Sequence, residues 1–110
     1  MATQIRKEWL VWAPGVPNMD ETRFKVRPDH IKNAIALKES GRMPWGGGVL
    51  EKHNEDGDTA GLLVAVFTVY ANTEEEAWKV VTEDPYTKNG IWDVKQVKIY
   101  PWKTTIRIPL

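Results

Sequence analysis

Residues 61–70, with the sequence GLLVAVFTVY, constrain the fold most, because nearly every position in them is apolar. Successive side chains of a β-strand point to opposite faces of its sheet, so a strand here presents apolar groups to both faces. Residues 5–13 (IRKEWLVWA) share this property between Trp9 and Ala13. We therefore expect both segments to be central strands of a sheet that is covered on its two faces.

Proline, glycine and capping residues divide the rest of the chain into further elements. We expect, in order, a strand at 5–13, a helix from Phe24 or Pro28 to Ser40, strands at 42–51 and 61–70, a helix from the Thr73–Glu76 capping box to Asp84, and a strand at 91–102. This β-α-β-β-α-β order is typical of the ferredoxin-like α+β fold, a four-stranded antiparallel sheet with two helices on one face. Right-handed crossovers then place the first and third strands, which are apolar on both faces, in the centre.

The first helix carries an apolar stripe. At about 100° per residue, Phe24, Ile31 and Ile35 share one side of the helix, and such a stripe is normally the packing face. His30 and Leu37 lie on the adjacent flank of this stripe. A side chain at that edge would be partly removed from water.

The second face of the sheet has no helix to cover it. Six Trp in 110 residues supply aromatic area that must be buried in a core, an interface or around a ligand. The open face would expose a larger apolar patch than monomers usually tolerate. We expect a second copy of the chain to cover it, which gives a homodimer packed sheet to sheet.

Composition excludes several classes of protein. The length suits a single domain, with a core over about residues 5–103 and a tail over 104–110. Fifteen basic and fifteen acidic residues give zero net charge, which argues against a nucleic-acid partner, and the absence of Cys excludes thiolate chemistry. The longest apolar run, Leu62–Phe67, is far shorter than the about 20 residues of a membrane span. With no secretory signal visible, we expect a cytoplasmic protein without a membrane partner.

Motifs for metals and cofactors are missing as well. His30 and His53 have no metal-ligand spacing, so we expect no metal site. The run Trp45-Gly-Gly-Gly48 lacks the spacing of a phosphate loop, and we expect no cofactor. Glycines in a strand mark either a plain bulge or the close approach of another group, here a ligand near Gly47 or the second subunit.

Three residues are candidates for chemistry, each with a plainer alternative. His30 could act as a general acid or base, or be a structural histidine at a helix edge. Asp84 could orient an imidazole, or simply belong to an Asp-Pro turn. Arg27, one helical turn before His30, could bind a carboxylate, phosphate or enolate oxygen, or form a surface salt bridge. From spacing alone the plainer interpretations are favoured.

Six short motifs together resemble the YCII-related (YciI-like) family. They are Val26-Arg-Pro-Asp-His30, Gly46-Gly-Gly48, Thr73-Glu-Glu-Glu-Ala77, Glu83-Asp-Pro-Tyr86, Gly90-Ile-Trp-Asp93 and Tyr100-Pro-Trp102. The likeness runs from Glu8 to about Lys103, and Trp45, Trp102 and the residues after Arg107 depart from it. It implies a dimeric α/β-barrel architecture and places the family's characteristic histidine and aspartate at His30 and Asp84, as an active-site pair.

A contact between His30 and Asp84 needs a particular arrangement. In a plain ferredoxin-like frame, the start of the first helix and the end of the second lie roughly 15 Å apart for a ten-residue helix. Three solutions stay open: His30 lies well inside its helix, the loop after Val81 folds back, or the contact crosses the dimer.

The expected function follows from the resemblance and these residues. It is a cofactor-independent enzyme for isomerisation, elimination or dehydration of a small cyclic or carbonyl compound. His30 would transfer a proton, Asp84 would orient it or act as the second acid–base group, and Arg27 would hold negative charge. The substrate would lie against a water-poor wall formed by Trp45, Gly47, Tyr86 and Trp92. The alternatives are a non-catalytic small-molecule-binding domain and a dimerisation module.

Overall fold

A computed structural model describes residues 6–55 and 62–109. Its elements are β1 (Glu8–Pro14), α1 (Asp20–Glu39), β2 (Gly46–Leu50), β3 (Leu62–Tyr70), α2 (Glu74–Glu83), α3 (Pro85–Lys88), the 3-10 helix η1 (Val94–Gln96) and β4 (Lys98–Trp102). The strands form one antiparallel sheet in the order β2-β3-β1-β4, with β3 and β1 in the centre. The ferredoxin-like α+β fold and its two central strands are therefore confirmed.

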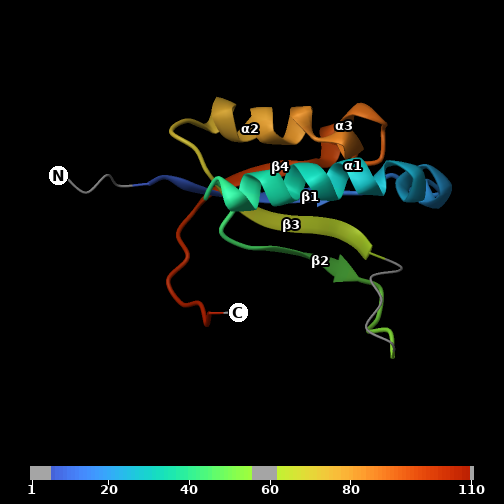
Figure 1. The fold of residues 1–110 in the computed structure, drawn as a ribbon, viewed down its shortest axis with the longest axis horizontal. Helices are drawn as coiled ribbons and strands as arrows, with labels where there is room; N and C mark the ends of the chain where they lie inside the picture. Colours follow the sequence, from blue (N-terminus) through green and yellow to red (C-terminus); the bar gives the residue numbers. More distant parts are fainter. Residues whose placement is uncertain (1–5, 56–61, 110) are drawn as a thin grey trace.

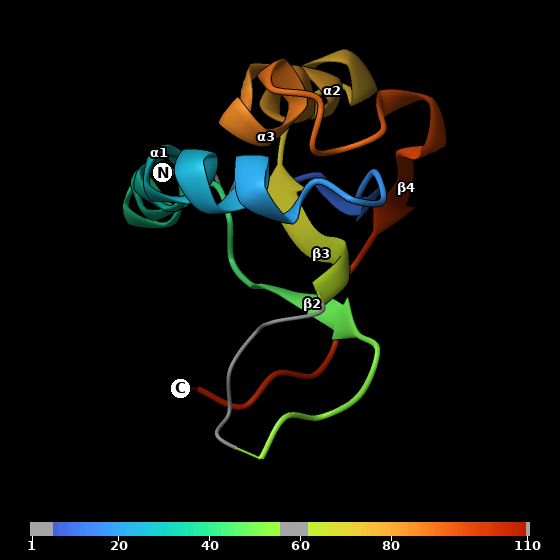
Figure 2. The ribbon, with the colours of Figure 1, turned by 90° about the vertical axis from the view of Figure 1, so that its right-hand side faces the viewer.

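The helices lie on one side of the sheet, as Figures 1 and 2 show. Val11 of β1 pairs with Phe67 of β3 and with Ile99 of β4, and alternation turns Val11 and Phe67 toward the helices. The buried core between sheet and helices contains Val11, Ala13, Phe67, Val69, Ala71, Ala77, Val80, Val81, Tyr86, Ile91, Trp92 and Val97.

Helix α2 follows the capping signal. The Thr73 hydroxyl accepts a hydrogen bond from the Glu76 backbone N–H at 3.2 Å, and the buried face is Ala77, Val80 and Val81. The helix ends at Glu83, as expected before Pro85. The expectation did not include α3, for which Asp84 serves as the N-cap.

The start of α1 was predicted too late. The helix begins at Asp20, not at Phe24 or Pro28, and Pro28 lies in its interior. Asp20 and Glu21 supply acidic side chains to the first turn, where they complement the helix dipole. The proline removes one N–H donor at an exposed position, and the helix continues through it.

The prediction that the apolar stripe of α1 is its packing face was also wrong. Phe24, Ile31 and Ile35 are 79%, 38% and 48% exposed. The flank that carries His30 and Leu37 faces the protein instead, yet α1 has no buried residue. The helix therefore stands off the sheet on the side of β2 and β3, which leaves room for a cavity.

The edge strands are shorter than expected. Strand β4 begins at Lys98 rather than at residue 91, because residues 91–97 form a single bridge between Trp92 and Gly15 and then η1. Strand β2 begins at Gly46 rather than at residue 42, and β1 begins at Glu8. Ile5 and Gly61, the first residues of two predicted strands, lie outside the described residues, as do residues 56–60 between the second and third predicted strands.

The face of the sheet away from the helices carries exposed large side chains, among them Trp12, Val49, Tyr100 and Trp102. Trp12 and Val49 are each 38% exposed. We call this surface the open face. No helix in the described part of the chain is long and apolar enough to cross a membrane.

Candidate active site

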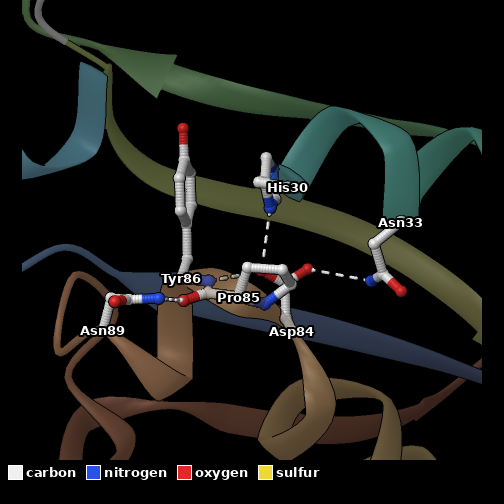
Figure 3. A network of polar contacts seen from close by, with 6 residues as sticks. All are labelled: His30, Asn33, Asp84, Pro85, Tyr86 and Asn89. Atoms are coloured by element: carbon white, nitrogen blue, oxygen red, sulfur yellow. Dashed lines mark hydrogen bonds and ion pairs between the residues drawn. The ribbon is translucent and has the colours of Figure 1, made fainter. Parts of the chain in front are cut away.

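His30 and Asp84 meet within one chain. His30 lies near the middle of α1, and its Nδ1 atom is 2.8 Å from Oδ1 of Asp84, at the junction of α2 and α3 (Figure 3). The early start of α1 places His30 inside the helix, which solves the distance problem of the plain ferredoxin-like frame. The two side chains are 22% and 6% exposed.

The Asp84 carboxylate is held by three donors. Besides the His30 ring, Oδ1 accepts from the backbone N–H of Tyr86 at 2.8 Å, which caps α3. Oδ2 accepts from the Asn33 side chain at 3.3 Å, and Asn33 lies one turn after His30 on the same helix. These bonds fix the carboxylate and, through it, the orientation of the imidazole.

Aromatic rings surround the imidazole. The Tyr86 ring stacks on His30 at 3.8 Å between centroids, and Trp92 meets His30 edge-on at 5.5 Å. Burial raises the pKa of the Tyr86 hydroxyl; the positive charges of Arg23 and Arg27 oppose this rise and the charge of Asp84 adds to it. Tyr86 is therefore a neutral phenol beside the pair at neutral pH.

A cavity of about 550 Å³ opens beside this pair, between α1 and the β2–β3 half of the sheet. Its lining includes His30, Ala34, Leu37, Lys38, Met43, Pro44, Trp45, Gly46, Gly47, Ala65, Phe67, Val80, Asp84, Trp92 and Arg107. Most of these groups are apolar, and the volume suits a small organic molecule. The imidazole is thus a polar group at the wall of an otherwise apolar pocket.

The structure brings most of the predicted site residues to this cavity. Trp45, Gly47 and Trp92 line it together with the His30–Asp84 pair. Tyr86 lies against the imidazole but is not part of the lining, and Arg27 is exposed outside it. The positive charge of Arg27 reaches the Tyr86 hydroxyl rather than the pocket.

Sequence reasoning missed Asn33 and Arg107. Asn33 could have been found from its spacing of three residues after His30, which places both on one helix face. Arg107 gave no such signal, because it lies in the tail after the last strand and reaches the cavity only through the path of that tail.

The described residues contain no group of three or more His, Cys, Asp or Glu side chains that could hold a metal ion. The Asp84 oxygens are already engaged with three donors. Most groups that line the cavity are apolar, which suits an organic ligand.

Fold and pocket together define a small α+β protein with a histidine–aspartate pair at the wall of an apolar cavity. The family model described as the YCII-related domain matches residues 8–103 of the chain. The chain belongs to the YCII-related family, as the six sequence motifs indicated.

Two fungal relatives match over nearly the whole chain. Aspercryptin biosynthesis cluster protein B of Emericella nidulans is 31% identical over 102 residues, which are 92% of this chain and 65% of that protein. Fusaric acid biosynthesis protein 2 of Gibberella fujikuroi is 32% identical over 104 residues, which are 94% of this chain and 99% of that protein. The chain thus spans about two thirds of the first relative and all but 1% of the second.

A solved structure shares the fold. It is 5-chloro-2-hydroxyhydroquinone dehydrochlorinase (TftG) from Burkholderia phenoliruptrix AC1100, in complex with 2,5-dihydroxybenzoquinone. The match has a TM-score of 0.76 at 20% identity and covers 89% of this chain and 95% of that one. At this identity the match shows the fold alone, and it agrees with the sheet order and helix placement described above.

Proposed function

We propose that the protein is an enzyme that moves a proton on a small cyclic or carbonyl compound, without a cofactor, through His30 and Asp84. The observation that carries the proposal is the 2.8 Å contact between these two side chains at the wall of the apolar cavity. A partly buried imidazole is the usual general acid–base group of enzymes.

The contact assigns a role to each ring nitrogen. An ionised carboxylate only accepts hydrogen bonds, so Nδ1 of His30 carries the proton that is donated to Asp84. Nε2 is then the atom that exchanges a proton with the substrate, and Asp84 stabilises the imidazolium that forms.

The proposed reaction begins when Nε2 removes a proton from a carbon next to a carbonyl, and the electron pair of that bond forms an enolate. Return of the proton to a different carbon completes an isomerisation. Departure of a neighbouring leaving group with its electron pair completes an elimination instead. If the leaving group is hydroxide, the imidazolium supplies the proton that makes it water.

The relatives support a substrate of this size and kind. Two are named for the biosynthesis of aspercryptin and of fusaric acid, and the structural neighbour is a dehydrochlorinase in complex with 2,5-dihydroxybenzoquinone. A dehydrochlorination is an elimination, which is one of the reactions proposed for this site. A non-catalytic binding domain with the same pocket is the alternative.

The test follows proton exchange directly. The protein is incubated in D₂O with a panel of small cyclic ketones, enones and hydroxylated quinones, and NMR records deuterium uptake or product formation. We expect wild type and His53→Ala, which changes an exposed loop histidine, to exchange at the same rate. His30→Ala should lose about 10²–10⁴-fold of that rate. If wild type binds these ligands but catalyses no deuterium exchange, the proposed enzyme is excluded and the non-catalytic binding domain is supported.

We also propose that the chain forms a homodimer through the open face. The exposed Trp12, Val49 and Tyr100 on a sheet face without helices support this, because contiguous apolar surface of this kind marks an association site. Analytical ultracentrifugation of Trp12→Glu should show a shift from dimer to monomer. Phe24→Glu, at an exposed position of α1, is the control and should leave the dimer unchanged.

A further inference from the structure

The chain after β4 does not leave the molecule. It turns back from the end of β4 and passes the segment that leads into β2, as the red trace in Figure 1 shows. Thr104 contacts β1 and the residue before β2, so the tail crosses the sheet on its open face. Three residues further on, Arg107 lines the same cavity as His30. The tail therefore contributes a charged side chain to the site.

A cluster around Thr104 fixes the path of the tail. The Thr104 hydroxyl donates to Oε2 of Glu8 at 2.7 Å, and its backbone N–H donates to Oε1 of Glu8 at 3.1 Å. The same hydroxyl accepts from the indole N–H groups of Trp45 at 2.9 Å and Trp102 at 3.0 Å. We call these four residues the Thr104 latch. The single hydroxyl of Thr104 thus donates one hydrogen bond and accepts two, and these bonds hold the tail in place.

The charged groups of the cavity do not balance. Its lining contains two cations, Lys38 and Arg107, and one anion, Asp84. The Asp84 oxygens are already taken by His30, Asn33 and the Tyr86 backbone. Arg107 has no carboxylate partner among residues 6–55 and 62–109. An apolar pocket with excess positive charge favours an anionic ligand.

From this arrangement we infer that Arg107 binds a negatively charged oxygen substituent of the substrate, and that the substrate class is a small planar ring bearing a carboxylate or an ionised hydroxyl. The inference rests on the proposed function, because it assigns a substrate to the same cavity. A guanidinium presents paired donors that match such oxygens, and the apolar lining accepts the ring. Arg107 thus acts as the specificity-determining residue.

The first experiment compares charged and neutral probes of one shape. Benzoate tests a carboxylate, 2,5-dihydroxybenzoquinone tests ionised hydroxyls, and benzamide is the neutral match, with affinities measured by calorimetry. Arg107→Gln should weaken binding of at least one anion by about tenfold to a hundredfold and leave benzamide unchanged. Lys103→Gln, which removes a tail cation outside the cavity, should change neither. Equal affinity of wild type and Arg107→Gln for both anions would overturn the inference.

The second experiment tests the latch as the positioning device. Thr104→Val removes the hydroxyl and should lower the preference for the anion over benzamide toward that of Arg107→Gln, and Thr104→Ser should restore it. Thr105→Val, at the neighbouring position outside the cavity, should keep the wild-type preference. A Thr104→Val protein with full preference would show that the latch does not position Arg107.

The two proposals fail separately. If wild type prefers the anions through Arg107 but catalyses no deuterium exchange, the anion site stands and the proposed enzyme fails. If His30-dependent exchange is found with neutral rings and the anions bind no better, the enzyme stands and the role of Arg107 fails.

Discussion

The Tyr86 ring lies parallel to the His30 imidazole, with 3.8 Å between ring centroids and 4° between the planes. Tyr86 also donates its backbone N–H to Oδ1 of Asp84, the same oxygen that contacts His30. One residue therefore positions both members of the pair, one through its ring and the other through its backbone.

Replacing Tyr86 should separate these two contributions. Tyr86→Leu keeps the backbone N–H but loses the stacked ring, so we expect a loss of about 1–3 kcal/mol in the free energy of unfolding. Tyr86→Phe keeps the ring and should stay close to wild type. Urea denaturation measures both. An unchanged stability in Tyr86→Leu would contradict the contribution of the stack.

Asp84→Asn should impair catalysis more than folding. Asparagine can still accept from the Tyr86 backbone, but it removes the negative charge that stabilises an imidazolium at His30. We expect the exchange rate to fall by about 10²–10⁴-fold with little change in the melting temperature. Wild-type exchange in Asp84→Asn would exclude the carboxylate from the mechanism.

Asn33→Ala should have a smaller effect in the same direction. It removes one of the donors that hold Asp84, at 3.3 Å, and leaves the His30 contact in place. Asn89→Ala is the matched control, because the Asn89 side chain donates to the Pro85 carbonyl and, in the described part of the chain, forms no bond to Asp84 (Figure 3). The exchange rate should fall in Asn33→Ala alone. Equal rates in the two variants would show that Asn33 does not position the carboxylate.

Stability should depend on pH through Glu8. Burial alone would raise the Glu8 pKa, but the Thr68 and Thr104 hydroxyls and the Thr104 N–H lower it below its usual value of 4.5. A lowered pKa in the folded state gives stability that is present above about pH 4.5 and is lost as the pH falls through the folded pKa.

Unfolding of wild type and Glu8→Gln at a series of pH values checks this. Wild type should be the more stable protein at neutral pH, and the difference should shrink as the pH falls below 4.5. A difference that is constant with pH would assign the effect of Glu8 to packing instead.

Adjacent glycines of β2 should respond differently to alanine. A Cβ on Gly46 would lie 3.1 Å from Cβ of Phe67 at the cavity wall, whereas a Cβ on Gly47 would meet nothing within 4 Å. Gly46→Ala should therefore weaken ligand binding and cost about 1 kcal/mol or more of stability. Gly47→Ala should be close to wild type in denaturation, because the added methyl group meets no protein atom. The reverse order would show that the cavity wall gives way at Phe67.

The parts of the fold that the sequence predicted are those with strong local or alternating signals. The doubly apolar β1 and β3 lie in the sheet centre, and the Thr73 cap begins α2 as expected. Helix α1 failed because its signals conflict. Pro28 suggests a start, and the Phe24–Ile35 stripe suggests a packing face, but a cavity rather than a core lies beneath the helix.

The candidate site also contains residues that the sequence predicted and residues that it did not. His30 and Asp84 were predicted as a pair from the resemblance to the YCII-related family. The length of α1 that lets the two side chains meet could not be deduced, because Pro28 suggested a later start of the helix. Arg107 depends on where a tail without regular structure returns, which is set by the distant Glu8 and Trp45. Such long-range polar contacts leave no periodic pattern in a sequence.

Because Arg107 lies beyond the last strand, the residue proposed to select the ligand and the residues proposed to move the proton occupy separate stretches of the chain. Exchange of the final few residues would redirect the pocket toward new compounds while the sheet, the helices and the imidazole stay as they are. Chimeras that graft one family member's terminus onto another would be a direct route to altered selectivity.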